Sequence, residues 1–268
     1  MGNEDAGLAW QVGVWDGISR LYWEEVDRRF EPVVDGVVQR AELKPGERVL
    51  DLGTGTGAVA AKAAAAVSPE GEVVAVDISP EMLALARQRA DQPGGHPYRV
   101  TEGRAEAIPA PDGSFDAVLA SLSLMYAIDR EAAARELGRV LRPGGRLVAA
   151  VWGDPDVCDI VLFQQTAGSF APSPPVPGVG PGALADAGPF LDQLARHGIR
   201  ARVETEISGF DFPNFMRAWE VLARVTTAAL SPERREEAQA AVCSVMWPAP
   251  GQRRAFRNTT QFIVGIRS

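Results

Sequence analysis

Short runs of β-branched and other apolar residues alternate with alanine-rich runs of helical period between residues 48 and 152. The apolar runs predict strands at Arg48–Leu52, Glu72–Asp77, Tyr98–Glu102, Phe115–Ala120 and Arg146–Trp152. The helices expected between them are Ala58–Val67, Pro80–Ala90 and Arg130–Leu141. Strands that alternate with helices form a parallel sheet covered on both faces, so the pattern predicts an α/β fold.

The last third of the chain follows a different pattern. Two further β-rich runs, Ala201–Ser208 and Gln261–Arg267, are separated by a segment of mostly helical character. Within that segment, Phe210–Leu230 is rich in aromatic residues and forms either the core of a helical cap or the lining of an apolar pocket. Earlier, the proline- and glycine-rich residues 171–181 exclude a helix or a central strand. They form either a surface loop or the wall of a substrate channel.

A glycine-rich turn joins the first predicted strand to the helix that follows it. The strand ends in the sequence VLDL and runs directly into GTGTG, which contains Gly53, Gly55 and Gly57. Glycines allow a ligand to approach the backbone closely, and the N-terminus of the next helix supplies free N–H groups. Asp77 ends the second strand, where its carboxylate can accept hydrogen bonds from two ribose hydroxyls. These features indicate a nucleoside cofactor, and they also match the pattern of dinucleotide-binding enzymes.

Charge and composition exclude several other classes of function. The formal net charge is −8 and the 27 basic residues are scattered, so nucleic acid is not an expected partner. The two cysteines and two histidines are not spaced as metal ligands, and no metal site is predicted. No apolar run is long enough to span a membrane, and no signal peptide is visible, so we expect a cytoplasmic protein.

The motifs of the first half resemble those of class I S-adenosylmethionine-dependent methyltransferases. The sequence VLDLGTGTG is similar to the first motif of that family, and VVAVDISPEML to the second. The segments EGRAEAIPAPDGSFDAVLAS and LRPGGRLV resemble the third to fifth motifs, in the order and spacing of the family. Among its members, the likeness is to small-molecule enzymes of the ubiquinone/menaquinone C-methyltransferase type.

This resemblance implies a Rossmann-like, seven-stranded, mostly parallel sheet with N-terminal helices and a helical cap inserted before the last strand. We expect a single domain over residues 1–268, with an N-terminal helical cap at 1–45 and a cofactor-binding core at 46–152. Residues 153–268 would supply a substrate-side loop, a cap insert at 209–258 and the final strands.

The resemblance also implies roles for individual residues toward S-adenosylmethionine and its product, S-adenosylhomocysteine. Three glycines and an acid would lie behind the methionine part, namely Gly53, Gly55, Gly57 and Asp51. Asp77 would hold the ribose, and Ile78 and Met82 would sandwich the adenine. Ala105 would donate its backbone N–H to the adenine ring, Ser121 would lie near the methionyl group and Tyr22 would close the open side. The family often has an acid where this chain has Arg104, which cannot accept a hydrogen bond, so Glu106 or a backbone carbonyl would replace it.

The acceptor of the methyl group is expected to be an apolar small molecule, with the protein acting as a monomer or homodimer. The residues expected to line its pocket are Trp15, Met125, Tyr126, Phe215 and Trp219. The histidine often found after the fourth strand is absent here, and Tyr126 is the candidate for orienting or deprotonating the acceptor. Three functions remain open: methyl transfer to a natural-product (polyketide-like) intermediate, a cyclisation catalysed by a methyltransferase-like cyclase (pericyclase), and a nicotinamide- or cofactor-sensing role.

Overall fold

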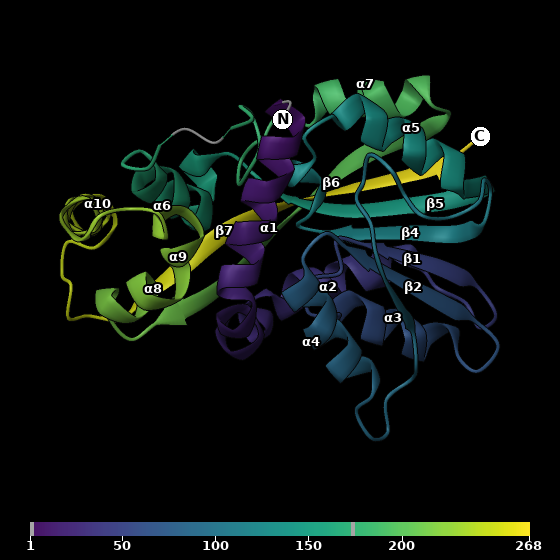
Figure 1. Ribbon diagram of the computed structural model, residues 1–268, viewed down its shortest axis with the longest axis horizontal. Helices are drawn as coiled ribbons and strands as arrows, with labels where there is room; N and C mark the ends of the chain where they lie inside the picture. Colours follow the sequence, from purple (N-terminus) through teal and green to yellow (C-terminus); the bar gives the residue numbers. More distant parts are fainter. Residues whose placement is uncertain (1–2, 173–174) are drawn as a thin grey trace.

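A seven-stranded sheet in the order β3-β2-β1-β4-β5-β7-β6 runs through the molecule (Figure 1). The computed structural model describes residues 3–172 and 175–268. Its strands are β1 (Arg48–Leu52), β2 (Glu72–Asp77), β3 (Arg99–Glu102), β4 (Phe115–Ser121), β5 (Leu141–Trp152), β6 (Ile199–Phe212) and β7 (Arg254–Arg267). The pairs among the first five strands are parallel, and β7 pairs antiparallel with both β5 and β6. The predicted Rossmann-like, mostly parallel sheet is therefore confirmed.

Helices cover both faces of this sheet (Figure 1). One face carries α2 (Asp27–Ala41), α3 (Ala58–Val67) and α4 (Pro80–Ala90), and the other carries α5 (Arg130–Val140) and α7 (Gly188–Arg196). The central strands are buried on both faces, which explains why they read as continuous apolar runs without alternation. The start of α4 is capped, because the Ser79 hydroxyl accepts from Met82 N at 3.1 Å and Pro80 occupies the first turn.

The N-terminal segment is almost entirely helical. It consists of α1 (Asn3–Leu21), a π-helical stretch (Tyr22–Val26) and α2. Figure 1 shows α1 crossing in front of the sheet edge at which the parallel strands end. The π-helical stretch lies at the junction of α1 and α2, and such irregularities are frequent at functional sites.

The cap insert is shorter than the sequence predicts. It spans residues 213–253 rather than 209–258, because β6 continues to Phe212 and β7 begins at Arg254. The insert contains α8 (Phe215–Leu222), α9 (Arg224–Thr227) and α10 (Pro232–Met246), and it packs against α6 (Asp159–Gly168). The extra length of both strands comes from cross-strand pairs such as Phe210 opposite Phe256, whose rings stack with centroids 5.4 Å apart.

The other differences lie at the ends of elements. The structure starts β3 at Arg99 rather than Tyr98 and ends α5 at Val140 rather than Leu141. It assigns β5 from Leu141, but pairing with β4 shifts from Leu141 opposite Phe115 to Arg146 opposite Ala117. The segment of sequence RPGG at residues 142–145 is therefore an irregularity within β5, and the regular ladder begins at Arg146, where the sequence predicts the strand to start.

Candidate functional site

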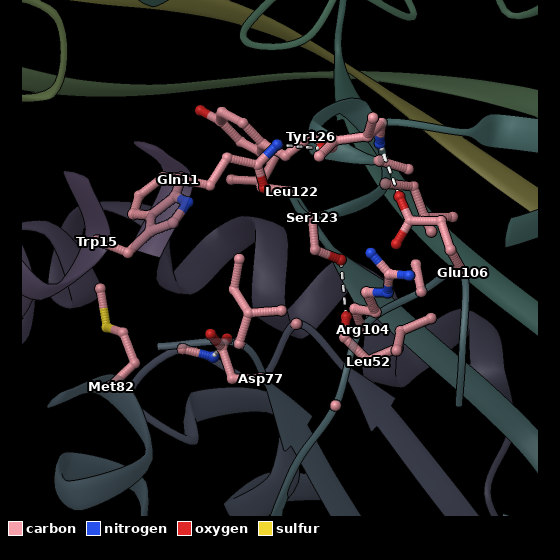
Figure 2. A pocket seen from close by; sticks show the side chains of 18 of the residues that line it. Gln11, Trp15, Leu52, Asp77, Met82, Arg104, Glu106, Leu122, Ser123 and Tyr126 are labelled. Atoms are coloured by element: carbon pink, nitrogen blue, oxygen red, sulfur yellow. Dashed lines mark hydrogen bonds between the residues drawn. The ribbon is translucent and has the colours of Figure 1, made fainter. Parts of the chain in front are cut away.

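A deep hollow lies at the carboxyl ends of β1, β2 and β4, under the N-terminal helices. This first cavity encloses about 810 Å³, including the space at its mouth. Parallel α/β sheets bind ligands at this edge. Figure 2 shows its lining, to which α1 contributes Gln11 and Trp15 and the strand ends contribute Asp77 and Ser123.

The glycine turn forms the floor of the first cavity. Gly53 N and Thr54 N both donate to Val76 O, at 2.8 and 2.9 Å, which ties the turn to β2. A Cβ on Gly53 would lie 2.3 Å from Ser123 Cβ, so only glycine fits there. Gly55 has φ +53°, and a Cβ on it would have no neighbour within 4 Å, so a side chain there would project into the open cavity. These two glycines therefore have different physical roles.

Gly57 and Asp51 lie behind the turn and do not line the first cavity. A Cβ on Gly57, which has φ +85°, would approach the Tyr98 hydroxyl to 2.3 Å. Asp51 is 1% exposed, and its Oδ2 accepts from the Thr54 hydroxyl at 2.6 Å. Burial, with a smaller effect of the nearby Asp77 carboxylate, raises the pKa of this carboxyl to about 7. Asp51 therefore braces the turn through Thr54, and its predicted place beside the methionine part of the cofactor stays a prediction.

Asp77 lines the first cavity at the end of β2. Its carboxylate accepts from Gly55 N at 2.8 Å and from Ser79 N at 3.0 Å, so the turn and the start of α4 hold it in place. Burial raises the pKa of this carboxyl, while the two backbone N–H groups lower it. An oxygen that accepts one backbone hydrogen bond retains a second lone pair, which a ribose hydroxyl can use.

The proposed adenine side of the cavity is formed by the segments that follow β2 and β3. Ile78, Met82, Arg104, Ala105 and Glu106 all line the cavity. In the view of Figure 2, Arg104 and Glu106 lie across the cavity from Trp15 and Met82. One oxygen of Glu106 accepts from Ile128 N at 2.7 Å, which fixes the loop after β4. Glu106 thus has a structural role in addition to the predicted one.

The N-terminal helices are fastened over the cavity by two carboxylates. Asp16 on α1 accepts from the Ser79 hydroxyl at 2.5 Å and from Glu81 N at 3.2 Å. Asp27, at the start of α2, accepts from the Thr56 hydroxyl at 2.8 Å and pairs with Arg89. Sequence reasoning missed both contacts, because they join segments far apart in the chain.

A second cavity adjoins the first and encloses about 570 Å³, including the space at its mouth. Trp15, Tyr22, Leu122 and Tyr126 line both cavities. The rest of its lining comes from α1, α2, the end of β5, α6 and the cap: Ile18, Leu21, Val26, Phe30, Met125, Trp152, Ile160, Gln164, Pro181, Val221, Leu222 and Val225. None of these described lining residues carries a charge.

Two predicted pocket residues lie elsewhere. Phe215 and Trp219 do not line either cavity and are 3% and 8% exposed. Their rings pack on each other and on Trp247 and Phe163, with centroids about 6 Å apart. The aromatic segment is thus the core of the cap, and α8 turns Val221 and Leu222 toward the cavity.

Of the proline-rich residues 171–181, Pro181 lines the second cavity. Gly180 N also donates to Met125 O at 3.0 Å, which joins this end of the loop to the segment after β4. Residues 173 and 174 lie outside the described residues. The described part supports the interpretation of a pocket wall.

The segment after β4 positions Tyr126 through a constrained backbone. Leu122 has φ +56°, an uncommon conformation for a non-glycine residue, and its N–H donates to Ala150 O at 2.8 Å. Gln11 on α1 donates to the carbonyl of Tyr126 at 2.8 Å. Burial raises the pKa of the Tyr126 hydroxyl, so it stays protonated at neutral pH. The predicted role as a base is therefore disfavoured, and hydrogen-bond donation remains available.

Two negative findings concern the described residues. No group of three or more His, Cys, Asp and Glu side chains gathers there in a way that could hold a metal ion. No helix in that part of the chain has the length and apolar character needed to cross a bilayer.

Comparison with known proteins supports the resemblance seen in the motifs. Residues 50–149 match the family described as methyltransferase domain. The chain is 39% identical over 140 residues to the ubiquinone/menaquinone biosynthesis C-methyltransferase UbiE of Hahella chejuensis, covering 52% of each protein. It is 45% identical over 112 residues to the enzyme of the same name from Xanthomonas oryzae, covering 41% of this chain and 44% of the other. The aligned region thus spans about half the length of these curated relatives.

Solved structures share the fold at low sequence identity. The YcgJ protein of Bacillus subtilis has a TM-score of 0.66 at 21% identity, over 88% of this chain and 98% of that one. A putative methyltransferase from Bacillus halodurans has a TM-score of 0.63 at 22% identity, over 87% and 97%. The [4+2]-cyclase SpnF has a TM-score of 0.55 at 23% identity, over 88% and 80%. At these identities the likeness establishes the fold alone.

Proposed function

Because residues 50–149 match the methyltransferase domain family and the chain has the class I methyltransferase fold, we propose that this protein methylates an apolar small molecule. The methyl donor would be S-adenosylmethionine, whose sulfonium carries an electrophilic methyl group. The observation that carries the proposal is that two cavities, one polar at its base and one apolar, meet at Trp15, Tyr22, Leu122 and Tyr126.

The residues of the first cavity fit the methyl donor. Gly55 leaves a space that any side chain would fill, as a closely approaching ligand requires. Asp77 offers a fixed carboxylate beside this space, in a position to accept hydrogen bonds from ribose hydroxyls. Ile78 and Met82 supply apolar surface for the adenine, and Tyr22 covers the cavity from the N-terminal side.

The second cavity supports an acceptor without a fixed charge. A permanently charged group there, such as a carboxylate or a phosphate, would lose its hydration without gaining an oppositely charged side chain, and only neutral polar groups such as the tyrosine hydroxyls are present. Transfer by direct displacement depends on alignment in a site that excludes water, which the N-terminal helices and the cap provide. We infer an aromatic or polyketide-like acceptor from a natural-product pathway, and the curated relatives, named as C-methyltransferases, make carbon the first site to test.

The direct test is incubation with S-adenosylmethionine and a panel of apolar phenols, hydroquinones and β-diketones, read by mass spectrometry. The proposal expects one product heavier by a methylene group, together with S-adenosylhomocysteine in equal amount. Release of S-adenosylhomocysteine with no methylated product would contradict it, as would failure of the protein to bind either nucleoside.

A cyclase is the second candidate. The observation that favours it is that no His, Lys, Asp or Glu side chain is among the described residues that line the second cavity. A pericyclic reaction needs no proton transfer, so a cavity that only shapes the substrate is sufficient for it. The [4+2]-cyclase SpnF shares the fold. With a linear polyene acceptor, a product of unchanged mass and altered chromatographic retention would support cyclisation.

A further inference from the structure

Two tyrosines stand at the junction of the two cavities. Tyr22, the first residue of the π-helical stretch, and Tyr126, the last residue of the 3₁₀ turn after β4, line both. They come from segments more than 100 residues apart, and the fold brings them to the point through which the methyl group must pass.

The rings are held by packing on both sides of Trp15. The Trp15 ring lies edge to face with Tyr126 at a centroid distance of 4.9 Å and with Tyr22 at 6.4 Å. Tyr22 also packs edge to face against Phe30 at 6.2 Å. The position of Tyr126 is fixed further by Gln11 and by the left-handed backbone of Leu122. Aromatic rings held in this way can present their hydroxyls with little loss of side-chain entropy.

Neither hydroxyl forms a hydrogen bond to another residue in the part of the chain that the structure describes. The third tyrosine, Tyr98, donates its hydroxyl to Ala86 O at 2.8 Å, as buried tyrosines usually do. Tyr22 and Tyr126 make no such bond to a described residue. Both side chains are half-buried and line the cavities, so their hydroxyls remain available to donate to a ligand bound there.

Both groups stay protonated at neutral pH. Burial raises the pKa of the Tyr126 hydroxyl and of the Tyr22 hydroxyl, and the carboxylates of Asp27 and Asp77 raise the latter further. These two carboxylates already accept hydrogen bonds, Asp27 from Thr56 and Asp77 from Gly55 N. The tyrosines therefore face the acceptor as neutral donors.

We propose that Tyr22 and Tyr126 donate hydrogen bonds to one oxygen of the acceptor, which is a phenol or an enolisable ketone bound as its anion and methylated at the conjugated carbon. This inference rests on the proposed function and narrows its substrate class. It requires no basic side chain, which agrees with the uncharged lining of the second cavity.

The electron balance is complete without a further reactant. The acceptor loses its proton to solvent before it binds, and the two hydroxyls hold the resulting oxyanion. The electron pair delocalised onto the conjugated carbon forms the new carbon–carbon bond as the methyl–sulfur bond breaks and its pair stays on sulfur. Anion and sulfonium become two neutral products. Carbon is favoured over oxygen because two hydrogen bonds from the tyrosines withdraw electron density from the oxygen and lower its nucleophilicity. A phenol product regains its aromatic ring when the hydrogen on that carbon is lost to solvent and the oxygen is reprotonated.

The test uses the full chain saturated with S-adenosylhomocysteine and 4-nitrophenol as the probe, whose phenolate has its own visible absorbance. Wild-type protein is expected to bind the probe as phenolate and to lower its apparent pKa. Y22F and Y126F should each weaken phenolate binding on the order of 10-fold to 100-fold, because each removes one hydrogen bond to a charged oxygen. The control W10F changes an exposed aromatic side chain of α1 that lines neither cavity, and it should bind as wild type.

Two further measurements separate the possible failures. Nitrobenzene, which lacks the phenolic oxygen, should bind to Y22F and Y126F as it binds to wild type. A similar loss of affinity for nitrobenzene and for 4-nitrophenol would mean distorted packing and would overturn the inference. Equal phenolate affinity in wild type, Y22F and Y126F, with S-adenosylhomocysteine bound normally, would overturn the inference and leave the proposed function intact. Failure of wild type to bind S-adenosylhomocysteine would contradict the proposed function itself.

Discussion

Among single residues, Asp51 has an unusual environment. It lies behind the glycine turn, 1% exposed, with one oxygen bonded to Thr54 and the other, Oδ1, without a partner among the described residues. Its pKa rises to about 7 on folding because burial disfavours the charged form. A buried acid of this kind favours the folded state when protonated and opposes it when ionised.

The consequence is a pH dependence of stability with a definite sign. Between the ordinary pKa of 3.8 and a folded value of about 7, the folded state binds the extra proton, so the free energy of unfolding falls as pH rises through this range. D51N keeps an acceptor for Thr54 and cannot ionise. Between pH 5 and pH 8 the free energy of unfolding should therefore fall less in D51N than in wild type. The two falls should differ by a few kcal/mol, as measured by urea denaturation at each pH. Parallel curves for the two proteins would show that Asp51 does not titrate in this range.

Residues of the first cavity were predictable where their signal is local. The glycine turn, Asp77 and the start of α4 are encoded within about one strand–turn–helix unit. Gln11, Leu122 and Ser123 could not be found in the same way. Their place in the site depends on α1 crossing the sheet edge and on a left-handed backbone held by Ala150, and neither leaves a pattern in nearby residues.

At the scale of elements, the N-terminal helices are joined to the cofactor core by few but well-placed contacts. Asp16 binds the start of α4, and Asp27 joins α2 to the glycine turn and to Arg89. The Asp27 side chain is 13% exposed and the Arg89 side chain 21%, so this pair is largely shielded from water. The helices that cover the first cavity are therefore tied to the turn that forms its floor.

Removal of the Asp27 side chain is expected to weaken the attachment of the N-terminal helices to the glycine turn. D27A leaves the Arg89 charge and the Thr56 hydroxyl without this partner, and should lower the free energy of unfolding by about 2 kcal/mol. It should also speed amide hydrogen exchange in α1 and α2 while the central strands keep their protection. The control is D35A, on the same helix α2 as Asp27. It removes an exposed ion pair with Lys62 of α3 and should change stability by less than about 0.5 kcal/mol. Similar effects for both variants would contradict the special role of Asp27.

The cap helix α8 contributes both to the packing inside the cap and to the lining of the second cavity. Phe215 and Trp219 pack inside the cap, whereas Leu222 lines the cavity. L222W should fill the cavity and weaken binding of apolar acceptors at least 10-fold, at a cost of about 1–3 kcal/mol in stability from overpacking. Affinity for S-adenosylhomocysteine should not change, because Leu222 does not line the first cavity. M216W on the exposed side of α8 is the control, and equal acceptor binding in both variants would show that the acceptor lies elsewhere.

At the scale of the whole molecule, the sheet and its flanking helices were predictable, and the extent of the cap was not. Strands β1, β2 and β4 are buried on both faces and are therefore continuous apolar runs, so local pattern indicates them even where the partner is distant, as Leu50 of β1 is from Val118 of β4. The outer halves of β6 and β7 are stabilised by pairs such as Phe210 with Phe256, whose partners are separated by the whole insert. The sequence of either strand alone does not reveal that pairing. The aromatic residues at the end of β6, such as Phe210, therefore look like part of the cap.

The claim on which the account depends is that the carboxyl edge of the sheet binds the nucleoside of S-adenosylmethionine through Asp77. Calorimetric titration with S-adenosylhomocysteine tests it most directly. The account predicts binding by wild type that NAD does not displace, and affinity lowered on the order of 100-fold in D77A, because a charged acceptor of two hydroxyls is lost. Absence of binding to wild type, or equal affinity for D77A and wild type, would contradict it.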